Sequence, residues 1–417
     1  MKFLHCADIH LDSPLQGIAK HPDASSGTIR IATRAAFENV VSIAMSEAVD
    51  FVLIAGDLYD TALQSFESAL FFNRQMARLR EADIKVFLAY GNHDAAIKLI
   101  KNLRVPDNVR VLSHSHPETI IDEALGIAVH GQSFAKQAVT DDLAANYPAA
   151  LPGLFNIGIL HTNLGGNSSH ENYAPSSLGT LVNKGYQYWA LGHVHNRQVV
   201  HESPWVVYPG NTQGRQIREA GEKTCELITV ADTGQLSLQP MATSAVPWYL
   251  VEVDCATAAG PEDVYDVVGD RLQRIPAKAE GRTAVVRILL TGTSRAHSGL
   301  VRDEDKLRNE IASLAMQVDG PLWIERMVVQ TTPLLNVEEL LRREDPIGEV
   351  LRVLRSLPGN PEALMEIADS LQDLRKKLPH EITAGAEALP LDELHIARAL
   401  GEVEKSLVVR LSETEAQ

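Results

Sequence analysis

The sequence predicts an α/β protein, and three of its features support this class. Short continuous apolar runs recur in the first half of the chain, and strands that are covered on both faces of a parallel sheet have this pattern. Polar blocks rich in glycine, histidine, aspartate and asparagine follow these runs directly. Other segments carry apolar residues at three-four spacing, which is typical of amphipathic helices.

Five continuous apolar runs are the expected strands of the first part of the chain. Ligands of open α/β sheets bind just beyond the carboxyl ends of the strands. The residues that follow each run are therefore candidate site residues. The runs cover residues 2–7, 51–55, 86–90, 155–160 and 188–191.

The polar blocks after these runs supply side chains that bind metals. Imidazole, carboxylate and amide oxygen together suit manganese, iron or zinc, and no thiolate set of a structural zinc site is present. Two metals about 3.5–4 Å apart can activate a water and hold a phosphate for in-line displacement. The blocks are Asp8-Ile9-His10, Gly56-Asp57, Gly91-Asn92-His93-Asp94, His161 and Gly192-His193-Val194-His195.

Each block alone also has a simple structural interpretation, because aspartate and asparagine commonly cap helices and form turns. Independent turns do not explain why every block supplies metal-compatible side chains after an apolar run. The glycines at positions 56, 91 and 192 each precede a candidate ligand. We expect an unusual dihedral angle or a close backbone approach there.

The blocks resemble those of the calcineurin-like metallophosphoesterases. Longer strings resemble the SbcD-type DNA-repair exonucleases, and the Leu-Asp-Ser-Pro string at 11–14 is most similar to the bacterial YhaO subfamily. The resemblance covers about residues 1–240. The strings are Ala-Asp-Ile-His-Leu-Asp-Ser-Pro (7–14), Ala-Gly-Asp-Leu-Tyr-Asp (55–60), Gly-Asn-His-Asp (91–94), Ala-Leu-Gly-His-Val-His (190–195) and Tyr-Pro-Gly-Asn-Thr-Gln-Gly-Arg (208–215).

The resemblance implies a metallophosphoesterase β-sandwich flanked by helices for residues 1–240. Alternating strand and helix patterns predict a small α+β domain at 247–332, which would correspond to the capping domain of SbcD-like nucleases. Helical periodicity predicts a helical C-terminal segment at 335–417. The expected strands are 248–253, 283–290 and 322–330, and the expected helices are 65–82, 262–274, 303–316, 337–343, 346–357, 361–378 and 391–411.

The resemblance also implies how the site residues share two divalent metal ions, with manganese the metal expected. Asp57 would bridge the two ions. The first ion would be held by Asp8, His10, Asp57 and His195, and the second by Asp57, Asn92, His161 and His193.

His93 is the expected catalytic residue, because the family places a histidine that is not a ligand directly after the asparagine ligand. A side chain that titrates near neutral pH can stabilise the transition state or protonate the leaving oxygen. Asp94 would orient His93, and a turn or helix cap is the alternative for Asp94. Arg215 is the expected substrate-binding residue, since its guanidinium group suits phosphate. Asp60 stands where related nucleases often have histidine, which affects the expected substrate choice more than the expected reaction.

The charge of the chain is unusual for a nuclease. The sequence has 38 Lys and Arg against 54 Asp and Glu, a net charge of −16. Sequence-independent DNA affinity normally depends on contacts of lysine and arginine with phosphate, although bound cations add local positive charge. We therefore expect DNA to be bound weakly by this chain alone. The resemblance implies help from a partner, a coiled-coil ATPase of the SbcC or YhaN type, and a homodimer is a further candidate assembly.

The sequence also limits the location of the protein. No apolar run approaches the ~20 residues of a membrane span, and the start of the chain lacks the apolar region of an export signal. The three cysteines lack pair spacing. We expect no membrane association and a cytoplasmic location.

Hydrolysis of DNA phosphodiester bonds, by an exonuclease or endonuclease in DNA repair, is the predicted function. The first alternative is a phosphodiesterase or phosphatase that acts on nucleotides or other small phosphoesters, and the acidity of the chain favours it slightly. The second alternative is a scaffold for an ATPase with a vestigial metal site. A missing ligand would indicate the scaffold, and the sequence contains every expected ligand.

Overall fold

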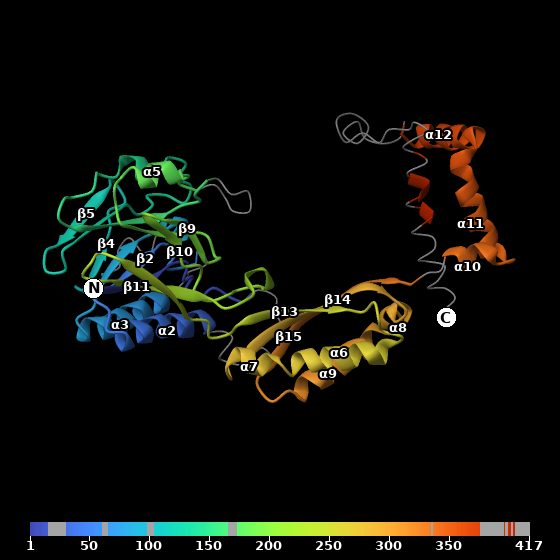
Figure 1. Cartoon of the computed structure of the whole chain (residues 1–417), viewed down its shortest axis with the longest axis horizontal. Helices are drawn as coiled ribbons and strands as arrows, with labels where there is room; N and C mark the ends of the chain where they lie inside the picture. Colours follow the sequence, from blue (N-terminus) through green and yellow to red (C-terminus); the bar gives the residue numbers. More distant parts are fainter. Residues whose placement is uncertain are drawn as a thin grey trace. The chain divides into compact units, whose positions relative to one another are not determined.

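The computed structural model describes residues 1–15, 31–60, 66–97, 104–165, 173–334 and 337–375, together with 396, 399–401, 403 and 404. The chain divides into two compact units, which Figure 1 shows in sequence colours. Unit 1 comprises Met1–Leu250, Gln273–Arg287 and Val318–Arg326, and unit 2 comprises Val251–Leu272, Ile288–Gln317 and Met327–Gln417.

The first sheet of unit 1 contains three of the predicted strands as parallel neighbours. Its strand order is β12-β11-β1-β2-β3-β4, and the strands at 2–7, 51–55 and 86–90 are confirmed as β1, β2 and β3. Pro240 lies in the edge strand β12, where a residue without an N–H group is tolerated. The strands are β1 (Lys2–Cys6), β2 (Phe51–Ala55), β3 (Lys85–Ala89), β4 (Val109–Val111), β11 (Thr224–Val230) and β12 (Leu236–Ala242).

The second sheet of unit 1 contains the other two predicted strands. Its order is β5-β6-β7-β8-β10-β9, and the runs at 155–160 and 188–191 are confirmed as the parallel neighbours β7 and β8. The strands are β5 (Glu118–Asp122), β6 (Ile127–Gly131), β7 (Phe155–His161), β8 (Tyr188–Gly192), β9 (Gln198–Glu202) and β10 (Trp205–Tyr208).

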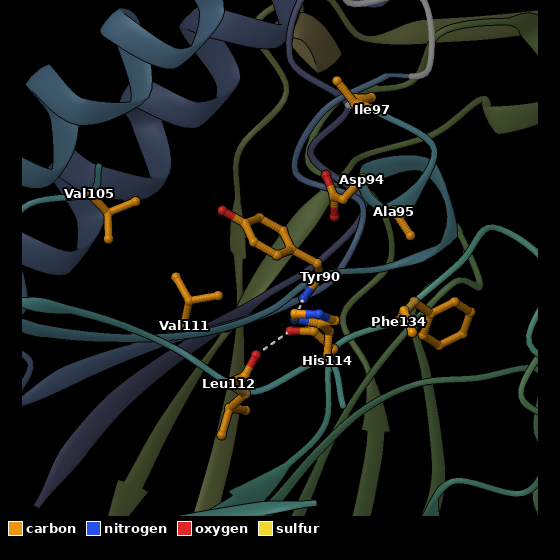
Figure 2. A pocket seen from close by; sticks show the side chains of 11 residues that line it. Tyr90, Asp94, Ala95, Ile97, Val105, Val111, Leu112, His114 and Phe134 are labelled. Carbon is orange, nitrogen blue, oxygen red and sulfur yellow. Dashed lines mark hydrogen bonds between the residues drawn. The ribbon is translucent and has the colours of Figure 1, made fainter. Parts of the chain in front are cut away.

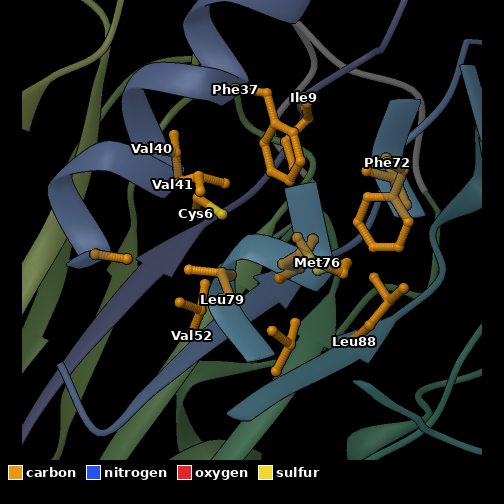
Figure 3. Packing of buried hydrophobic residues seen from close by; sticks show 14 of the residues in the cluster. Cys6, Ile9, Phe37, Val40, Val41, Val52, Phe72, Met76, Leu79 and Leu88 are labelled. Atoms are coloured by element: carbon orange, nitrogen blue, oxygen red, sulfur yellow. The ribbon is translucent and has the colours of Figure 1, made fainter. Parts of the chain in front are cut away.

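The two sheets pack face to face, and helices cover their outer faces. Phe51, Leu53 and Ala55 of β2 point into the core between the sheets. Val52 and Ile54 point the other way, into a core with the helices α2 (Ala32–Ser46) and α3 (Glu67–Glu81), part of which Figure 3 shows. Because both faces of β2 are buried, its sequence is a continuous apolar run.

The outer face of the second sheet has its own cover. Trp189 and Leu191 of β8 pack in a core with Leu181 of the helix α5 (Leu178–Val182) and Ala144 of the 3-10 turn η2 (Ala144–Asn146). The layers are therefore helix, sheet, sheet and helix. This arrangement confirms the predicted α/β sandwich flanked by helices.

The rest of the chain contains one smaller sheet and several helices. The sheet has the order β13-β14-β15. Its strands are β13 (Trp248–Asp254), β14 (Ala284–Ser294) and β15 (Leu322–Pro333). The expected helices at 262–274 and 303–316 are present as α6 and α9, and the predicted domain boundaries at 240, 247 and 332–335 stay predictions. The helices are α6 (Pro261–Leu272), α7 (Ile275–Ala279), α8 (His297–Arg302), α9 (Glu304–Met316), α10 (Val337–Arg342), α11 (Pro346–Ser356) and α12 (Pro361–Arg375).

The C-terminal helices α10, α11 and α12 confirm the expected helices at 337–343 and 346–357 and most of the one at 361–378. The expected helix at 391–411 lies largely outside the described residues. Within the part of the chain that the structure describes, no helix combines the length and apolar character needed to cross a bilayer.

His5 is a fully buried polar side chain inside the sandwich. Its Nε2 lies 3.2 Å from the Leu191 carbonyl oxygen, and its Nδ1 lies 3.0 Å from the Tyr188 hydroxyl. A carbonyl oxygen only accepts, so Nε2 donates and the ring joins β1 to β8. Burial lowers the pKa of His5 to about 3, and the hydrogen bond to Leu191 opposes this shift. The ring is therefore neutral in the folded protein near neutral pH.

We expect acid to destabilise the fold partly through His5. Between its ordinary pKa of 6.5 and the folded value of about 3, the unfolded chain binds a proton at His5 that the folded chain does not. The stability contributed by this group is thus complete above pH 6.5 and falls with pH, by up to about 1.4 kcal/mol per pH unit. Urea unfolding between pH 7 and 5 should show a smaller slope for His5→Gln than for the wild type. The variant His116→Gln, at an exposed position, should keep the wild-type slope, and equal slopes in all three proteins would contradict the prediction.

Candidate metal centre

The polar blocks of the sequence meet at one end of the sandwich. They follow the carboxyl ends of β1, β2 and β3 in one sheet and of β7 and β8 in the other. The two sheets touch there, because His161 Nδ1 at the end of β7 donates to the Ala55 carbonyl oxygen of β2 at 2.9 Å. Side chains from five separate loops therefore face one another.

One group of side chains at this end consists of Asp8, His10 and His195. One ligand atom from each lies within 4.8 Å of the others. The Nε2 atoms of His10 and His195 are 3.3 Å apart, and His195 Nε2 is 3.9 Å from Asp8 Oδ1. This set matches the first metal site that the sequence predicts, apart from the shared Asp57.

Asp57 occupies the centre of the cluster. Its Oδ2 lies 3.8 Å from His10 Nε2 and 3.5 Å from His161 Nε2, so it reaches both predicted metal positions. Asn92 Oδ1 lies 2.9 Å from the same His161 nitrogen. A carboxylate in this position has the geometry that a bridging ligand needs.

The donor set fits metal ions, because electron pairs converge without protons between them. His161 Nδ1 donates to a carbonyl oxygen, so in the neutral ring Nε2 is a bare acceptor, and it faces Asn92 Oδ1 and Asp57 Oδ2. His195 Nδ1 lies 2.8 Å from a carboxylate oxygen of Glu219, which likewise leaves Nε2 bare and facing His10. Acceptors at these separations repel one another unless a positive charge lies among them.

The pKa shifts of His161 and Asp57 also result from the close approach of these side chains. Burial by itself would lower the pKa of His161, but the attraction of Asp57 and a hydrogen bond to it raise that pKa to about 9. Burial would raise the pKa of Asp57, but His161 and the neighbouring histidines hold it well below its usual range. Asp57 is therefore an ionised, buried carboxylate, which is the form that a metal ligand requires.

His193 is placed differently from the other expected ligands. Its backbone N–H donates to both carboxylate oxygens of Asp8, at 3.1 and 2.9 Å. Its ring packs edge-on to His161, with centroids 5.2 Å apart. None of the three ligand groups found among the described residues includes His193, so its role as a ligand stays a prediction.

The loops that carry these residues have an unusual backbone. Asp8, His10, Asp57 and His193 have φ of 50°, 48°, 51° and 100°, in the region that glycine prefers. The first two loops hold each other, because Asp8 N–H donates to the Gly56 carbonyl and His10 N–H to the Asp57 carbonyl, both at 3.0 Å. Strained residues of this kind cluster at functional sites and persist where the surroundings fix them.

His93 lies at the edge of the cluster. Its side chain is 30% exposed, compared with 2% for Asp57. Its Nε2 is 3.9 Å from Asp57 Oδ2, and its Nδ1 is 3.9 Å from Asp60 Oδ1. Its ligand nitrogen also groups with His10 and Asp57. A partly exposed ring can reach a substrate, so this exposure favours the predicted catalytic role of His93 over that of a buried metal ligand.

Asp94 lies under the loops, beside His93 in sequence. Its carboxylate accepts hydrogen bonds from the backbone N–H groups of Leu58 (3.2 Å), Tyr59 (2.9 Å) and Gly91 (2.9 Å). Burial and repulsion by Asp57 raise its pKa to about 7, and the three backbone hydrogen bonds oppose that shift. These are the contacts of the capping alternative, and a catalytic role for Asp94 stays a prediction.

Arg215 lies near the cluster, as the sequence suggested. Its Nη1 is 3.4 Å from Asp60 Oδ2 and 3.3 Å from Ser13 Oγ, and its Nη2 is 3.6 Å from Glu219 Oε1. Asp60 thus stands between Arg215 and His93. The side chain of Arg215 is 15% exposed, so part of the guanidinium group reaches solvent beside the metal ligands.

Glu219 is a residue of this site that the sequence reasoning missed. It follows the last active-site loop, in the short turn η3 (Ile217–Glu219), and is buried. Burial would raise its pKa, but the hydrogen bond and attraction of His195 lower that pKa to about 2. The available signal was its spacing of four residues from Arg215, which suits an ion pair.

A cavity of about 390 Å³ is lined in part by Tyr90, Asp94 and Ala95 (Figure 2). Val105, Val111 and Phe134 also line it, and its walls are mainly apolar. Among the described residues that line it, Asp94 is the one carboxylate, and none is an expected metal ligand. The cavity is therefore separate from the metal centre.

Comparison with known proteins agrees with this site. Residues 1–197 match the family described as calcineurin-like phosphoesterase, and residues 248–332 match the middle domain of metallophosphoesterase YhaO. Metallophosphoesterase YhaO of Bacillus subtilis is 37% identical over 298 residues, which cover 70% of this chain and 72% of that protein. The site and the fold thus define a metal-dependent phosphoesterase, a hydrolase. The chain belongs to the calcineurin-like metallophosphoesterases of the YhaO family.

More distant similarities extend to a DNA repair protein. The DNA double-strand break repair protein Mre11 of Methanopyrus kandleri is 24% identical over 409 residues, which cover 88% of this chain and 85% of that protein. A dimetal phosphatase from Danio rerio aligns with a TM-score of 0.38 at 9% identity, covering 58% of this chain and 96% of that one.

We expect Gly192→Ala to disrupt the metal centre. A Cβ atom at this position would overlap the Ala55 carbonyl oxygen, which also accepts the hydrogen bond of His161. Overpacking of this kind costs about 1–3 kcal/mol, and here it would separate the two sheets at the site. The thermal unfolding temperature and the amount of divalent metal bound per chain should both decrease.

Gly260→Ala is the matched control for this substitution, because a Cβ at Gly260 meets open space. It should keep the wild-type unfolding temperature and metal content. Wild-type metal content in Gly192→Ala would show that the close approach of the sheets is not required.

Proposed function

We propose that this metallophosphoesterase is a manganese-dependent nuclease that hydrolyses DNA phosphodiester bonds in DNA repair. The observation that carries the proposal is the central Asp57, within reach of both predicted metal positions and beside the partly exposed His93. Similarity along most of the chain to a protein named for double-strand break repair supports DNA as the substrate.

The chain's own residues would divide the chemistry among them. When bound, two divalent cations would activate a water and neutralise charge on the phosphate. Asp57 would lie between the cations, and His10, His161 and His195 would help to hold them. His93 would stabilise the transition state or give a proton to the leaving oxygen, because its ring is partly exposed next to Asp57, whereas the rings of His10 and His161 are buried.

Asp60 and Arg215 would prepare the substrate side of the site. Asp60 faces His93 Nδ1 at 3.9 Å, from where its carboxylate can orient the ring. Arg215 pairs with Asp60 while its head group remains partly exposed. An arriving phosphate would meet the guanidinium group beside the cations.

The acidity of the chain supports the alternative, a phosphodiesterase of nucleotides or other small phosphoesters. The net charge is −16, and exposed acidic side chains cover the first turns of α6 and α9, with Glu262 and Asp263 on the former and Glu304 and Asp305 on the latter. Such surfaces repel a long polyanion more than a small one. Substrate length is therefore the property that separates the two candidates.

Cleavage of end-labelled single-stranded and double-stranded DNA with manganese tests the proposal, with cyclic nucleotides as competing substrates. We expect DNA to be cleaved, and Asn92→Ala to lose both metal and cleavage. Turnover of cyclic nucleotides without any DNA cleavage would replace the nuclease by the alternative. A wild-type chain that binds no manganese would favour the scaffold.

His93→Ala should separate catalysis from metal binding. Removing a general acid typically costs about 10²–10⁴-fold in rate. We expect a loss of this size in kcat with two manganese ions still bound, whereas Asp57→Asn should lose metal and activity together. Loss of an ion from His93→Ala would make this histidine a ligand, as its grouping with His10 and Asp57 allows.

We further propose that the C-terminal helices bind a coiled-coil ATPase of the SbcC or YhaN type. On α11, Leu351 is buried, while Val350 and Val353 are 46% and 52% exposed. Apolar side chains three residues apart on an exposed helix face suit a helix-in-groove contact.

A cytoplasmic location stays a prediction.

Co-elution with the candidate ATPase tests this contact. Val350→Asp with Val353→Asp should abolish co-elution, because the two charges would be buried in the interface. Glu349→Gln, on the same helix, is the control and should co-elute like the wild type. Unchanged association of a chain that lacks residues 335–417 would exclude these helices as the binding site.

A further inference from the structure

We propose that Glu219 is a positioning residue that orients the metal ligand His195 and the phosphate-facing Arg215 at the same time. The part that concerns His195 depends only on the metal centre. The part that concerns Arg215 rests on the proposed function.

The contacts of Glu219 come from three different residues. Oε1 lies 2.8 Å from His195 Nδ1 and 3.6 Å from Arg215 Nη2. Oε2 accepts hydrogen bonds from the Arg215 backbone N–H at 2.8 Å and from Asn211 Nδ2 at 2.9 Å. Both oxygens are therefore used, and one side chain joins a metal ligand to a substrate arginine.

The partners of Glu219 have one property in common. The arginine groups and the Asn211 amide nitrogen are donors, and the His195 ring can donate through Nδ1. Glu219 is 6% exposed, so little water can replace a lost contact. Only a side chain with two acceptor oxygens, a carboxylate, can accept hydrogen bonds from all of these donors. Glutamine has nearly the same shape, but its NH2 group is a donor and would face two of the donors.

The consequence for His195 is a fixed tautomer and a fixed ring plane. A carboxylate at Nδ1 keeps the proton on that nitrogen, which leaves the Nε2 electron pair for a metal. Nε2 is the atom that faces His10 Nε2 at 3.3 Å and Asp8 Oδ1 at 3.9 Å. Glu219 thus aims His195 at the first metal position.

The loop that carries Arg215 is itself held firmly. Gln213 Nε2 donates to the Val246 carbonyl at 2.7 Å, and Trp248 Nε1 donates to the Gly214 carbonyl at 2.9 Å. Asn211 also donates to the Gln213 carbonyl at 2.7 Å. The loop therefore cannot move easily to compensate for a substitution at Glu219. Such a substitution should change the positions of His195 and Arg215.

The test is a calorimetric titration of the metal-free full chain with manganese. This measurement needs no substrate. Glu219→Gln should weaken the binding of one of the two ions by about 10–100-fold, as loss of a partner behind a metal-binding histidine typically does. The other ion should keep its wild-type affinity. If the chain also cleaves DNA, the KM of the variant should rise, because Arg215 loses its support.

Glu222→Gln is the matched control, because Glu222 is exposed and pairs with Arg282 at 2.8 Å instead of with the site. It should bind both ions like the wild type. Wild-type binding of both ions by Glu219→Gln would overturn the proposal. Equal weakening of both ions, together with a lower unfolding temperature of the metal-free variant, would also overturn it, because that is the effect of general destabilisation.

A measurement on the wild type keeps the proposal testable if Glu219→Gln does not fold. Nitrogen NMR of the zinc-loaded chain reports which ring nitrogen of His195 carries the proton. The signal can be assigned by its loss in His195→Gln. A proton on Nδ1 is expected, and a proton on Nε2 would overturn the proposal.

Discussion

The structure at the metal centre depends on one electrostatic constraint, which is the burial of the ionised Asp57 among acceptor atoms. A buried carboxylate is costly unless positive charge compensates it. His161 and His10 both approach the Asp57 carboxylate with their Nε2 atoms. The arrangement is stable only if cations or protons lie among these atoms. Two metal ions would supply that charge and at the same time the chemistry of a phosphoesterase.

The sandwich makes this concentration of charge possible. β2 is buried on both faces, and its end is fixed by the neighbouring strands and by the second sheet. The loops that leave the strands have backbone angles that are unfavourable for aspartate and histidine, yet they are tied to one another by backbone hydrogen bonds. Asp94 also fixes these loops, because its carboxylate accepts hydrogen bonds from three backbone N–H groups. The cost of the strained loops is thus offset by the rigid core that carries them.

The acidic composition and the reaction on an anionic substrate are compatible for a local reason. Substrate attraction is set by the field at the site, and bound cations would add positive charge there that the net charge of the sequence omits. Asp60 and Glu219 both pair with Arg215, and these contacts fix the guanidinium group beside the metal-binding cluster. The net charge of −16 would repel a long polyanion, which agrees with the expectation that a partner protein helps to bind long DNA.

The sequence by itself determined the class of the fold and the residues that form the cluster. Continuous apolar runs result from strands buried on both faces, and every predicted strand of the sandwich is present, as are the helices at 65–82, 262–274 and 303–316. Only the tertiary structure decided which side chains support which ligands. The contact of Glu219 with His195 joins residues 24 apart, and that of Asp60 with His93 joins loops of different strands. Such pairs depend on how loops pack in space. Local periodicity and motif spacing carry no information about that packing.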